Sequence, residues 1–458
     1  MCGITGYTNF SSNKLISKGT LKKMSVSIAH RGPDHLGLVH NDNFGLAHNR
    51  LSILDLSSNG NQPMVYKNFT MVYNGEIYNF LEIKSELLKL GYQFHSKTDS
   101  EVVLKAFHCW GVKSFTKLNG IFAVAIYDSI NEKLVLCRDR LGVKPLYYTK
   151  INNLLIFGSE IKAILNSGLI KREINYQALS EYMFFVSPMG NQTIYNGVNK
   201  LSPGSFLTFD KNKFEIKKFW KLKKTQLNIS YEDAVSRTRY LIEKSVQRQL
   251  MSDVQVSTFL SGGIDSSAVT LLAAKHYTGK LNTYSVEFDY NHNDKSELDF
   301  AKKIANLAGS NHNELFISGD NIENLVEELV YIHDEPFADA ANIPLYLMCK
   351  ELKNEEKVVL QGDGGDEVFG GYNYYNYLHK VKNYSVPAKL LKFIFNNSGF
   401  IKSKSIERLQ RIANIVAEDS LSKKVGMLIS GNLMNESYIS TLSKDLRVSL
   451  KNSNPILE

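Results

Sequence analysis

Cysteine is the second residue of the chain, which makes Cys2 a candidate N-terminal nucleophile. Removal of Met1 would leave a thiol and a free α-amine on one residue. The amine titrates near pH ~8 and the thiol near ~8.5, so the amine can act as base for the thiol without a histidine. The alternative is a Cys2 that is simply buried in a first strand. The other three cysteines (Cys109, Cys137 and Cys349) are expected to be buried small hydrophobes.

A glycine-containing loop at 261–267, with the sequence Ser-Gly-Gly-Ile-Asp-Ser-Ser, is the second candidate site. Glycines let a backbone approach a ligand closely, and the N–H groups at a helix N-terminus attract anions. Ser261, Ser266 and Ser267 can donate to phosphate oxygens. Asp265 would repel phosphates unless a cation bridges them, which indicates Mg²⁺. The loop matches neither common nucleotide-binding glycine pattern, so the alternative is a serine-capped helix after a tight turn.

A similar stretch, Gly-Asp-Gly-Gly-Asp-Glu, begins at Gly362 and follows an expected strand at 357–361. Glycines and carboxylates at the carboxyl end of a strand suit a second metal-binding and phosphate-binding wall. A solvated acidic loop is the alternative.

The first 160 or so residues predict many short strands and few helices, which indicates a mixed α+β domain with layered sheets. The expected strands are 44–48, 70–73, 121–127, 133–138, 146–149 and 154–158, and the expected helices are 14–29, 80–90 and 100–110. A further strand is expected at 205–209, after the turn at Pro203 and Gly204.

From residue 231 onward, strands and helices alternate, which predicts a parallel sheet covered by helices. The expected strands are 254–260, 283–288, 314–317 and 357–361, and the expected helices are 231–250, 265–276, 296–308, 321–333 and 343–352. Residues 380–458 are expected to be helical and Lys-rich.

Composition limits the class of protein. The 458 residues are 43% hydrophobic and 22% charged, which is ordinary for a globular protein. The chain shows neither a long apolar run nor a secretory signal, so a cytoplasmic protein without a membrane span is expected. The net charge of +8 is spread along the sequence, and no nucleic-acid-binding motif accompanies it, so no nucleic-acid partner is expected.

Cys2, the two loops and several short motifs together resemble asparagine synthetase of the glutamine-hydrolysing type. The motifs lie in a shared order at 30–34 (HRGPD), 50–53 (RLSI), 73–79 (YNGEIYN), 99–101 (DSE), 138–140 (RDR) and 334–337 (DEPF). The resemblance implies an N-terminal-nucleophile-type glutaminase domain at 2–210, a linker at 211–230, and an ATP-pyrophosphatase-type synthetase domain with a parallel sheet at 231–458.

The resemblance implies that the first domain is a class II glutamine amidotransferase. Cys2 would attack the glutamine side-chain amide, form a thioester and release ammonia, while its own α-amine moves the proton. Asn74 and the Gly75 N–H match the oxyanion hole. Residues that match the glutamine-binding set are Arg50, Asn74, Gly75, Glu76 and Asp99. Arg50 would bind the α-carboxylate, and the two acids the α-ammonium. A surface ion pair is the alternative for Arg50 and Asp99, and Arg31 and Asp34 would order a loop over the site.

The second domain would bind Mg²⁺-ATP and aspartate. The aspartate β-carboxylate would attack the α-phosphorus, and ammonia arriving through a closed internal passage would displace AMP. Asp265 and Asp366 match the carboxylates that hold the metal. Residues that match the ATP and pyrophosphate site are Phe259, Leu260, Ser261, Gly262, Gly263, Asp265, Ser266, Val286, Gln361 and Gly362.

The family usually continues further at its C-terminus, where its acceptor-pocket motifs lie, so this sequence is expected to be shortened there. Two alternatives stay open. One is an amidotransferase that acts on another carboxylate, such as a sugar acid. The other is a glutaminase-only chain with an inactive synthetase half. Family members often form dimers, which leaves a homodimer open, although the sequence carries no interface signal.

Overall fold

The computed structural model describes residues 1–10, 16–288, 295–318, 322–339, 341–373, 375–376, 415–416 and 420. Nearly all of the stretch expected to be helical at 380–458 lies outside these residues. The chain divides into two compact units. The larger unit contains Met1–Glu173, Gly190–Glu335 and Ile343–Gln361, and the smaller unit contains Ile174–Met189, Pro336–Asn342 and the chain from Gly362 onward. The domain boundary at 211–230 stays a prediction.

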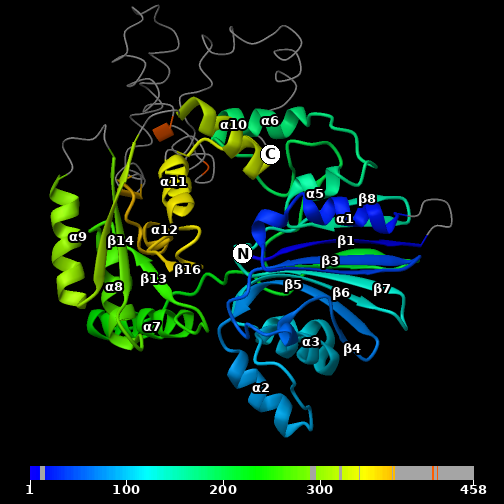
Figure 1. Ribbon diagram of the computed structural model, residues 1–458, viewed down its shortest axis with the longest axis horizontal. Coiled ribbons are helices and arrows are strands. Elements are labelled where there is room, and N and C mark those ends of the chain that lie inside the picture. The colour runs from blue at the N-terminus through cyan, green and yellow to red at the C-terminus, as the bar shows by residue number, and fades with distance from the viewer. Residues whose placement is uncertain are drawn as a thin grey trace, which may run out of the picture. The chain divides into compact units, whose positions relative to one another are not determined.

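Two six-stranded antiparallel sheets form the first half of the larger unit (Figure 1). The first sheet has the order β10-β8-β9-β1-β3-β2 and contains β1 (Gly3–Asn9), β2 (His35–His40), β3 (Phe44–Arg50), β8 (Tyr147–Ile151), β9 (Leu154–Gly158) and β10 (Asn199–Lys200). The second has the order β12-β11-β7-β6-β5-β4 and contains β4 (Met64–Tyr66), β5 (Phe69–Ile77), β6 (Gly120–Asp128), β7 (Lys133–Arg138), β11 (Ser205–Phe209) and β12 (Phe214–Lys218).

The inner strands of the second sheet, β5, β6, β7 and β11, are largely buried on both faces. In β6 the even-numbered residues from Phe122 to Ile126 join the core under the helices, and the odd-numbered residues from Ala123 to Tyr127 join the core that the first sheet shares. Helices α2 (Phe80–Lys89) and α3 (Asp99–Trp110) supply residues to the first of these cores, while α1 (Lys18–Val26) and α5 (Ile161–Leu165) pack on the other sheet. This helix–sheet–sheet–helix layering explains the nearly continuous apolar runs of the strands and confirms the predicted layered α+β architecture.

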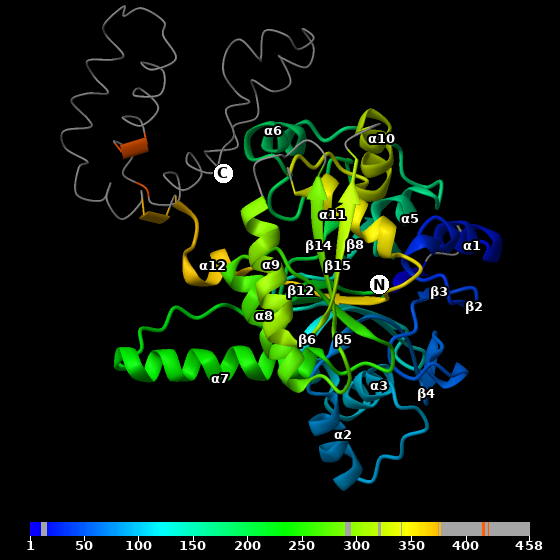
Figure 2. The same ribbon diagram turned by 60° about the vertical axis from the view of Figure 1, so that its left-hand side comes forward.

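A four-stranded parallel sheet follows in the same unit, in the order β15-β14-β13-β16. Its strands are β13 (Val256–Phe259), β14 (Asn282–Phe288), β15 (Asn311–Ile317) and β16 (Val358–Leu360), and the helices that alternate with them are α7 (Tyr231–Gln249), α8 (Ile264–His276), α9 (Lys295–Ala308), α10 (Ile322–His333) and α11 (Asn342–Leu352). Figure 2 shows β14 beside β15 and α8 beside α9. The predicted α/β parallel sheet is therefore confirmed.

Two details differ from the sequence-based expectations. Strand β12 lies inside the stretch expected to be a linker, where it pairs with β11 across a turn closed by Asp210 and Lys213. Its charged, exposed residues are typical of an edge strand, which a count of lysines cannot distinguish from a loop. The expectation that the three internal cysteines are buried is correct only for Cys137, because Cys109 is half-buried and Cys349 is exposed.

The helices within the described ranges include none that is both long and apolar enough to cross a membrane.

Truncation of a side chain between the two sheets should destabilise the protein. Leu136 is 0% exposed in that core, whereas Leu222 is 84% exposed. We expect Leu136→Ala to lower the free energy of unfolding by about 2–5 kcal/mol, since it removes buried methyl groups and leaves a cavity. Urea denaturation measures the change. Leu222→Ala is the control and should leave the unfolding midpoint unchanged; equal midpoints for all three proteins would contradict the placement of Leu136.

Candidate active site

Cys2 directly precedes β1, which pairs with β3 on one side and β9 on the other. Its Sγ lies 3.4 Å from the Leu51 backbone nitrogen, which donates to it, and 3.7 Å from the Leu51 carbonyl oxygen, to which it donates. Burial raises the pKa of the Cys2 thiol, so the thiol is protonated near neutral pH and needs a base before it can attack. Removal of Met1 would place an α-amine on the same residue, where it could serve as that base.

An unpaired donor lies on the neighbouring sheet, in β5. Asn74 is 1% exposed, and its side-chain nitrogen has no hydrogen-bond partner among the described residues. A buried donor without a partner costs about 1–3 kcal/mol, so each one calls for an explanation, of which a catalytic role is one. The next residue is glycine for a steric reason, because a Cβ at Gly75 would lie 2.3 Å from the Ile121 carbonyl oxygen. An amide that lacks a partner in the ligand-free protein is suited to stabilise an oxyanion.

The guanidinium of Arg50 organises a loop. Its Nη1 donates to the Ser57 carbonyl (2.7 Å) and to Asn61 Oδ1 (2.9 Å), and its Nη2 donates to the carbonyls of Leu54 (3.2 Å) and Asp55. Four of its five N–H groups are thus used, which leaves Nε–H for a ligand. Arg50 is buried and makes no ion pair with a described residue, so the alternative of a surface pair with Asp99 is wrong.

Two carboxylates, the buried Asp99 and the half-buried Glu76, interact electrostatically. Asp99, at the start of α3, accepts hydrogen bonds through Oδ2 from the Tyr73 hydroxyl (2.6 Å) and the Ile77 backbone N–H (2.8 Å). Burial raises the pKa of Asp99 to about 6, and burial together with the Asp99 charge raises the pKa of Glu76 well above its ordinary value. A cation placed between them would reverse both shifts, which is the behaviour expected of an ammonium-binding site.

Arg31 contacts the nucleophilic residue directly, which the sequence did not reveal. Its Nε donates to the Cys2 carbonyl oxygen at 3.0 Å, and its Nη1 pairs with Glu160 at 2.9 Å. Asp34 instead accepts from the Ser52 backbone N–H (2.8 Å) and pairs with Lys357 (2.7 Å).

Hydrogen bonds from its own serine hydroxyls stabilise the loop that follows β13. Ser261 Oγ lies 3.0 Å from Ser266 Oγ and accepts from the Gly263 backbone N–H at 3.3 Å. Gly262 has φ 83°, and a Cβ there would lie 2.6 Å from the Glu297 carbonyl oxygen, so only glycine fits. Gly263 caps α8 without a side-chain hydrogen bond, which leaves the first N–H groups of the helix available to an anion.

The other predicted nucleotide-site residues lie on, or directly after, strands of the parallel sheet that carries this loop. Phe259 ends β13, the Leu260 N–H donates to the Tyr284 carbonyl (2.8 Å), and Val286 lies in the neighbouring strand β14. Asp265, on the first turn of α8, is exposed and makes no ion pair with another described residue. Gln361 and Gly362 follow β16.

Asp366 lies in helix α12 (Gly365–Phe369) of the smaller unit, so its pairing with Asp265 stays a prediction. Within the described ranges, no group of three or more His, Cys, Asp or Glu side chains could hold a metal by itself.

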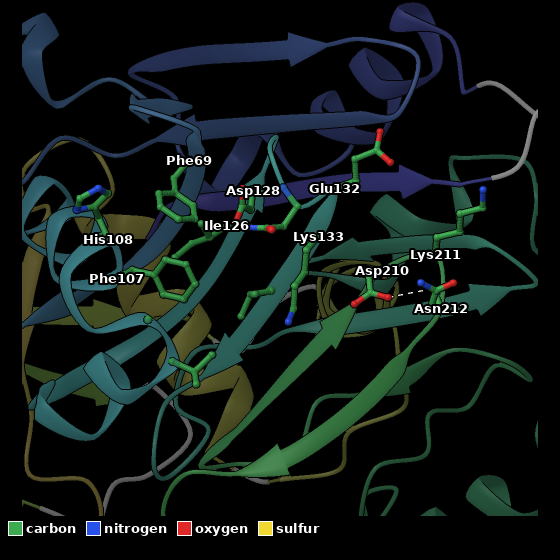
Figure 3. A pocket seen from close by; sticks show the side chains of 14 residues that line it. Phe69, Phe107, His108, Ile126, Asp128, Glu132, Lys133, Asp210, Lys211 and Asn212 are labelled. Atoms are coloured by element: carbon green, nitrogen blue, oxygen red, sulfur yellow. Dashed lines mark hydrogen bonds between the residues drawn. The ribbon is translucent and has the colours of Figure 1, made fainter.

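A cavity of about 690 Å³ lies elsewhere in the larger unit (Figure 3). Its lining includes Phe69, Phe107 and His108 at one end, and Asp210 and Lys211 at the other. It contains none of the predicted site residues, so the predicted chemistry does not take place there.

Comparison with known proteins identifies the family of the chain. Residues 1–220 match the model of the glutamine amidotransferase domain, and residues 237–431 match that of asparagine synthase. The chain is 36% identical over 401 residues to the putative asparagine synthetase [glutamine-hydrolyzing] 2 of Methanocaldococcus jannaschii, which covers 81% of this chain and 76% of that protein. This chain belongs to the glutamine-hydrolysing asparagine synthetase family.

Two further relatives show how widely the similarity extends. Asparagine synthetase [glutamine-hydrolyzing] 3 of Bacillus subtilis is 37% identical over 396 residues, 82% of this chain and 64% of that protein. A protein named amidase chry2 from Gibberella zeae is 30% identical over 405 residues, 81% of this chain and 60% of that protein. The chain thus spans 64% and 63% of the length of the two first Bacillus subtilis asparagine synthetases that it matches.

In this asparagine synthetase family member, the carboxylate pair should make glutamine binding depend on pH. Protonated carboxylates cannot bind an ammonium group, so we expect KM for glutamine to rise as the pH falls through about 6. Asp99→Asn removes the charge that raises the pKa of Glu76, so it should increase KM and move its remaining rise to lower pH. Glutamate release between about pH 5 and 8 measures both effects, because this range includes the Asp99 pKa of about 6.

Glu86→Gln, on the exposed face of α2, is the control and should follow the wild-type profile. A wild-type KM that does not change with pH would contradict the assignment of Glu76 and Asp99 to the substrate ammonium.

Proposed function

We propose that this chain synthesises asparagine from aspartate and ATP, using ammonia that it releases from glutamine, with AMP, pyrophosphate and glutamate as the other products. The observation that carries the proposal is the half-buried Cys2 thiol, held by the Leu51 backbone, together with the buried side-chain amide of Asn74, whose nitrogen has no partner among the described residues. The family membership and the hydroxyl-fastened loop before α8 support the second half of the reaction.

Glutamine cleavage uses the chain's first residues. After removal of Met1, the Cys2 α-amine takes the thiol proton as sulfur attacks the side-chain amide carbon, and then gives it to the departing ammonia. Asn74 Nδ2 and the Gly75 N–H stabilise the tetrahedral oxyanion. The acids Glu76 and Asp99 hold the substrate ammonium, and the one N–H of Arg50 that is not used within the loop is directed to its carboxylate.

Aspartate activation uses the loop at 261–267. The N–H groups of the first turn of α8 bind the pyrophosphate part of ATP, and the hydroxyls of Ser261 and Ser266 exchange their mutual hydrogen bond for phosphate oxygens. Backbone atoms of Phe259, Leu260, Val286, Gln361 and Gly362 hold the adenosine half. Mg²⁺, when bound, neutralises phosphate charge. The exposed Asp265 carboxylate fits such an ion, and Asp366 would complete the pair.

The name asparagine synthetase, which the similar proteins carry, supports aspartate as the acceptor of this chain. The similarity to a protein named as an amidase keeps a different acceptor carboxylate as the second candidate. Because glutamine, aspartate and ATP are metabolites of the cytoplasm, the proposal includes that location. A homodimer stays a prediction.

The two half-reactions should separate on substitution of the nucleophile. Cys2→Ala should abolish glutamate release and glutamine-dependent asparagine formation yet retain synthesis from ammonia, since ammonia bypasses the thiol. Pyrophosphate, AMP, glutamate and asparagine are measured with Mg²⁺-ATP, aspartate and either nitrogen source. Cys349→Ala, at an exposed cysteine, is the control.

Loss of both activities in Cys2→Ala would contradict two separate sites. Wild-type glutamate release without any pyrophosphate would instead show a glutaminase-only chain, and pyrophosphate release only with another carboxylate would show a different acceptor.

Removal of the Asp265 carboxylate, on the first turn of α8, should affect ATP use and not glutamine cleavage, the reverse of what is expected for Cys2→Ala. Asp265→Asn should stop pyrophosphate release and leave glutamate release at the wild-type rate, because only the ATP half loses its metal ligand. Asp233→Asn makes the same change on the first turn of α7 and should affect neither activity. Normal pyrophosphate release by Asp265→Asn would refute the metal-binding role.

A further inference from the structure

A chain of alternating charges leads away from the nucleophile. Arg31 donates through Nε to the Cys2 carbonyl oxygen (3.0 Å), and its Nη1 pairs with Glu160 Oε1 (2.9 Å). Glu160 pairs through its other oxygen with the ammonium of Lys162, and also lies 3.0 Å from His30 Nε2. The Arg31 guanidinium therefore fixes the position of the Cys2 backbone, and the Glu160 carboxylate holds Arg31 in place.

The series of charged side chains ends at Asp334, in the segment that follows α10. Lys162 Nζ lies 3.2 Å from Asp334 Oδ1 and 3.1 Å from the Ile332 carbonyl oxygen, and the Lys162 backbone N–H donates to Asp334 Oδ2 at 2.9 Å. The side chains of Arg31, Glu160, Lys162 and Asp334 are between 7% and 10% exposed. Asp334 belongs to the part of the sequence that matches asparagine synthase, whereas the other three belong to the glutamine amidotransferase part.

The backbone of Asp334, the last residue of this series of charges, has an unusual conformation. Asp334 has φ 62°, in the left-handed region that residues other than glycine seldom adopt. The next residue, Glu335, is buried and anchored: its Oε1 accepts from the Ile194 N–H (2.9 Å), and its Oε2 pairs with Lys200 (3.0 Å). Contacts on both sides of the strained residue thus determine where its carboxylate meets Lys162.

Stability alone does not account for such an arrangement. Buried ion pairs are often no more stabilising than well-packed apolar side chains of the same volume, because desolvation offsets their attraction. What ionic contacts provide is fixed geometry, and displacement of a reacting group by about 1 Å can cost roughly a hundredfold in rate.

We propose that Glu160, Lys162 and Asp334 are positioning residues for Cys2, so that the segment Asp334–Glu335 controls glutamine cleavage through Arg31. The inference rests on the glutaminase half of the proposed function. It makes a residue more than three hundred positions away in sequence a determinant of the reactivity of the N-terminal thiol.

The test compares glutamate release by the full-length variants Asp334→Asn and Lys162→Met with the wild type. We expect kcat to fall about ten- to a hundredfold, as for a displaced nucleophile, while KM for glutamine stays nearly unchanged because Arg50, Glu76 and Asp99 are untouched. Lys162→Arg keeps the positive charge and should retain most of kcat. Lys105→Met breaks another buried pair, with Glu101, that does not lead to Cys2, and it should keep the wild-type kcat.

The alkylation rate of Cys2 by iodoacetamide, followed by peptide mass spectrometry, is the second readout and should fall in the same two variants. Wild-type kcat and alkylation rate in both Asp334→Asn and Lys162→Met would overturn the proposal, as would an equal loss in Lys105→Met. A wild-type protein that releases no glutamate would refute the proposed function instead, and the alkylation rates would still decide the role of the charge chain.

Discussion

The site depends on polar groups that are withdrawn from water without a full set of hydrogen-bond or ionic partners in the protein. Burial raises the pKa values of the Cys2 thiol, Glu76 and Asp99, and the Asn74 amide nitrogen lacks a partner among the described residues. Each of these arrangements costs free energy, and the sheets around the groups supply the stability that offsets it. Under the proposed function, a zwitterionic amino acid with an amide side chain would give a partner to the Asn74 amide and to both carboxylates.

The sandwich brings these groups together from distant parts of the chain. Cys2 precedes a strand in the middle of one sheet, Asn74 and Glu76 lie on a strand of the other, and Asp99 begins the helix that packs behind it. Because the inner strands of both sheets are buried on both faces, they cannot shift register without moving apolar residues between two cores. The rigid layers therefore fix the distances that chemistry at the N-terminus requires.

Some elements could be read from the sequence and others could not, for identifiable reasons. Strands β7 and β9 are short apolar runs between turn residues, and their predicted bounds agree with the structure. Strand β12 was missed because lysines on an edge strand resemble a loop. Among the site residues, motif order was enough to select Cys2, Asn74 and Asp99, because they carry recognisable chemistry. The pairing of Lys162 with Asp334 had no signal of its own, since contacts between residues so far apart in sequence exist only after folding.

The central place of β1 has a consequence for the order of events during synthesis. The residue after Cys2 already pairs with β3, and β9, which completes the other side of β1, is translated about 150 residues later. During synthesis the terminus therefore stays without its β9 partner for an interval. If Met1 is removed, as the proposed function requires, this interval is one in which the first strand is not yet held on both sides.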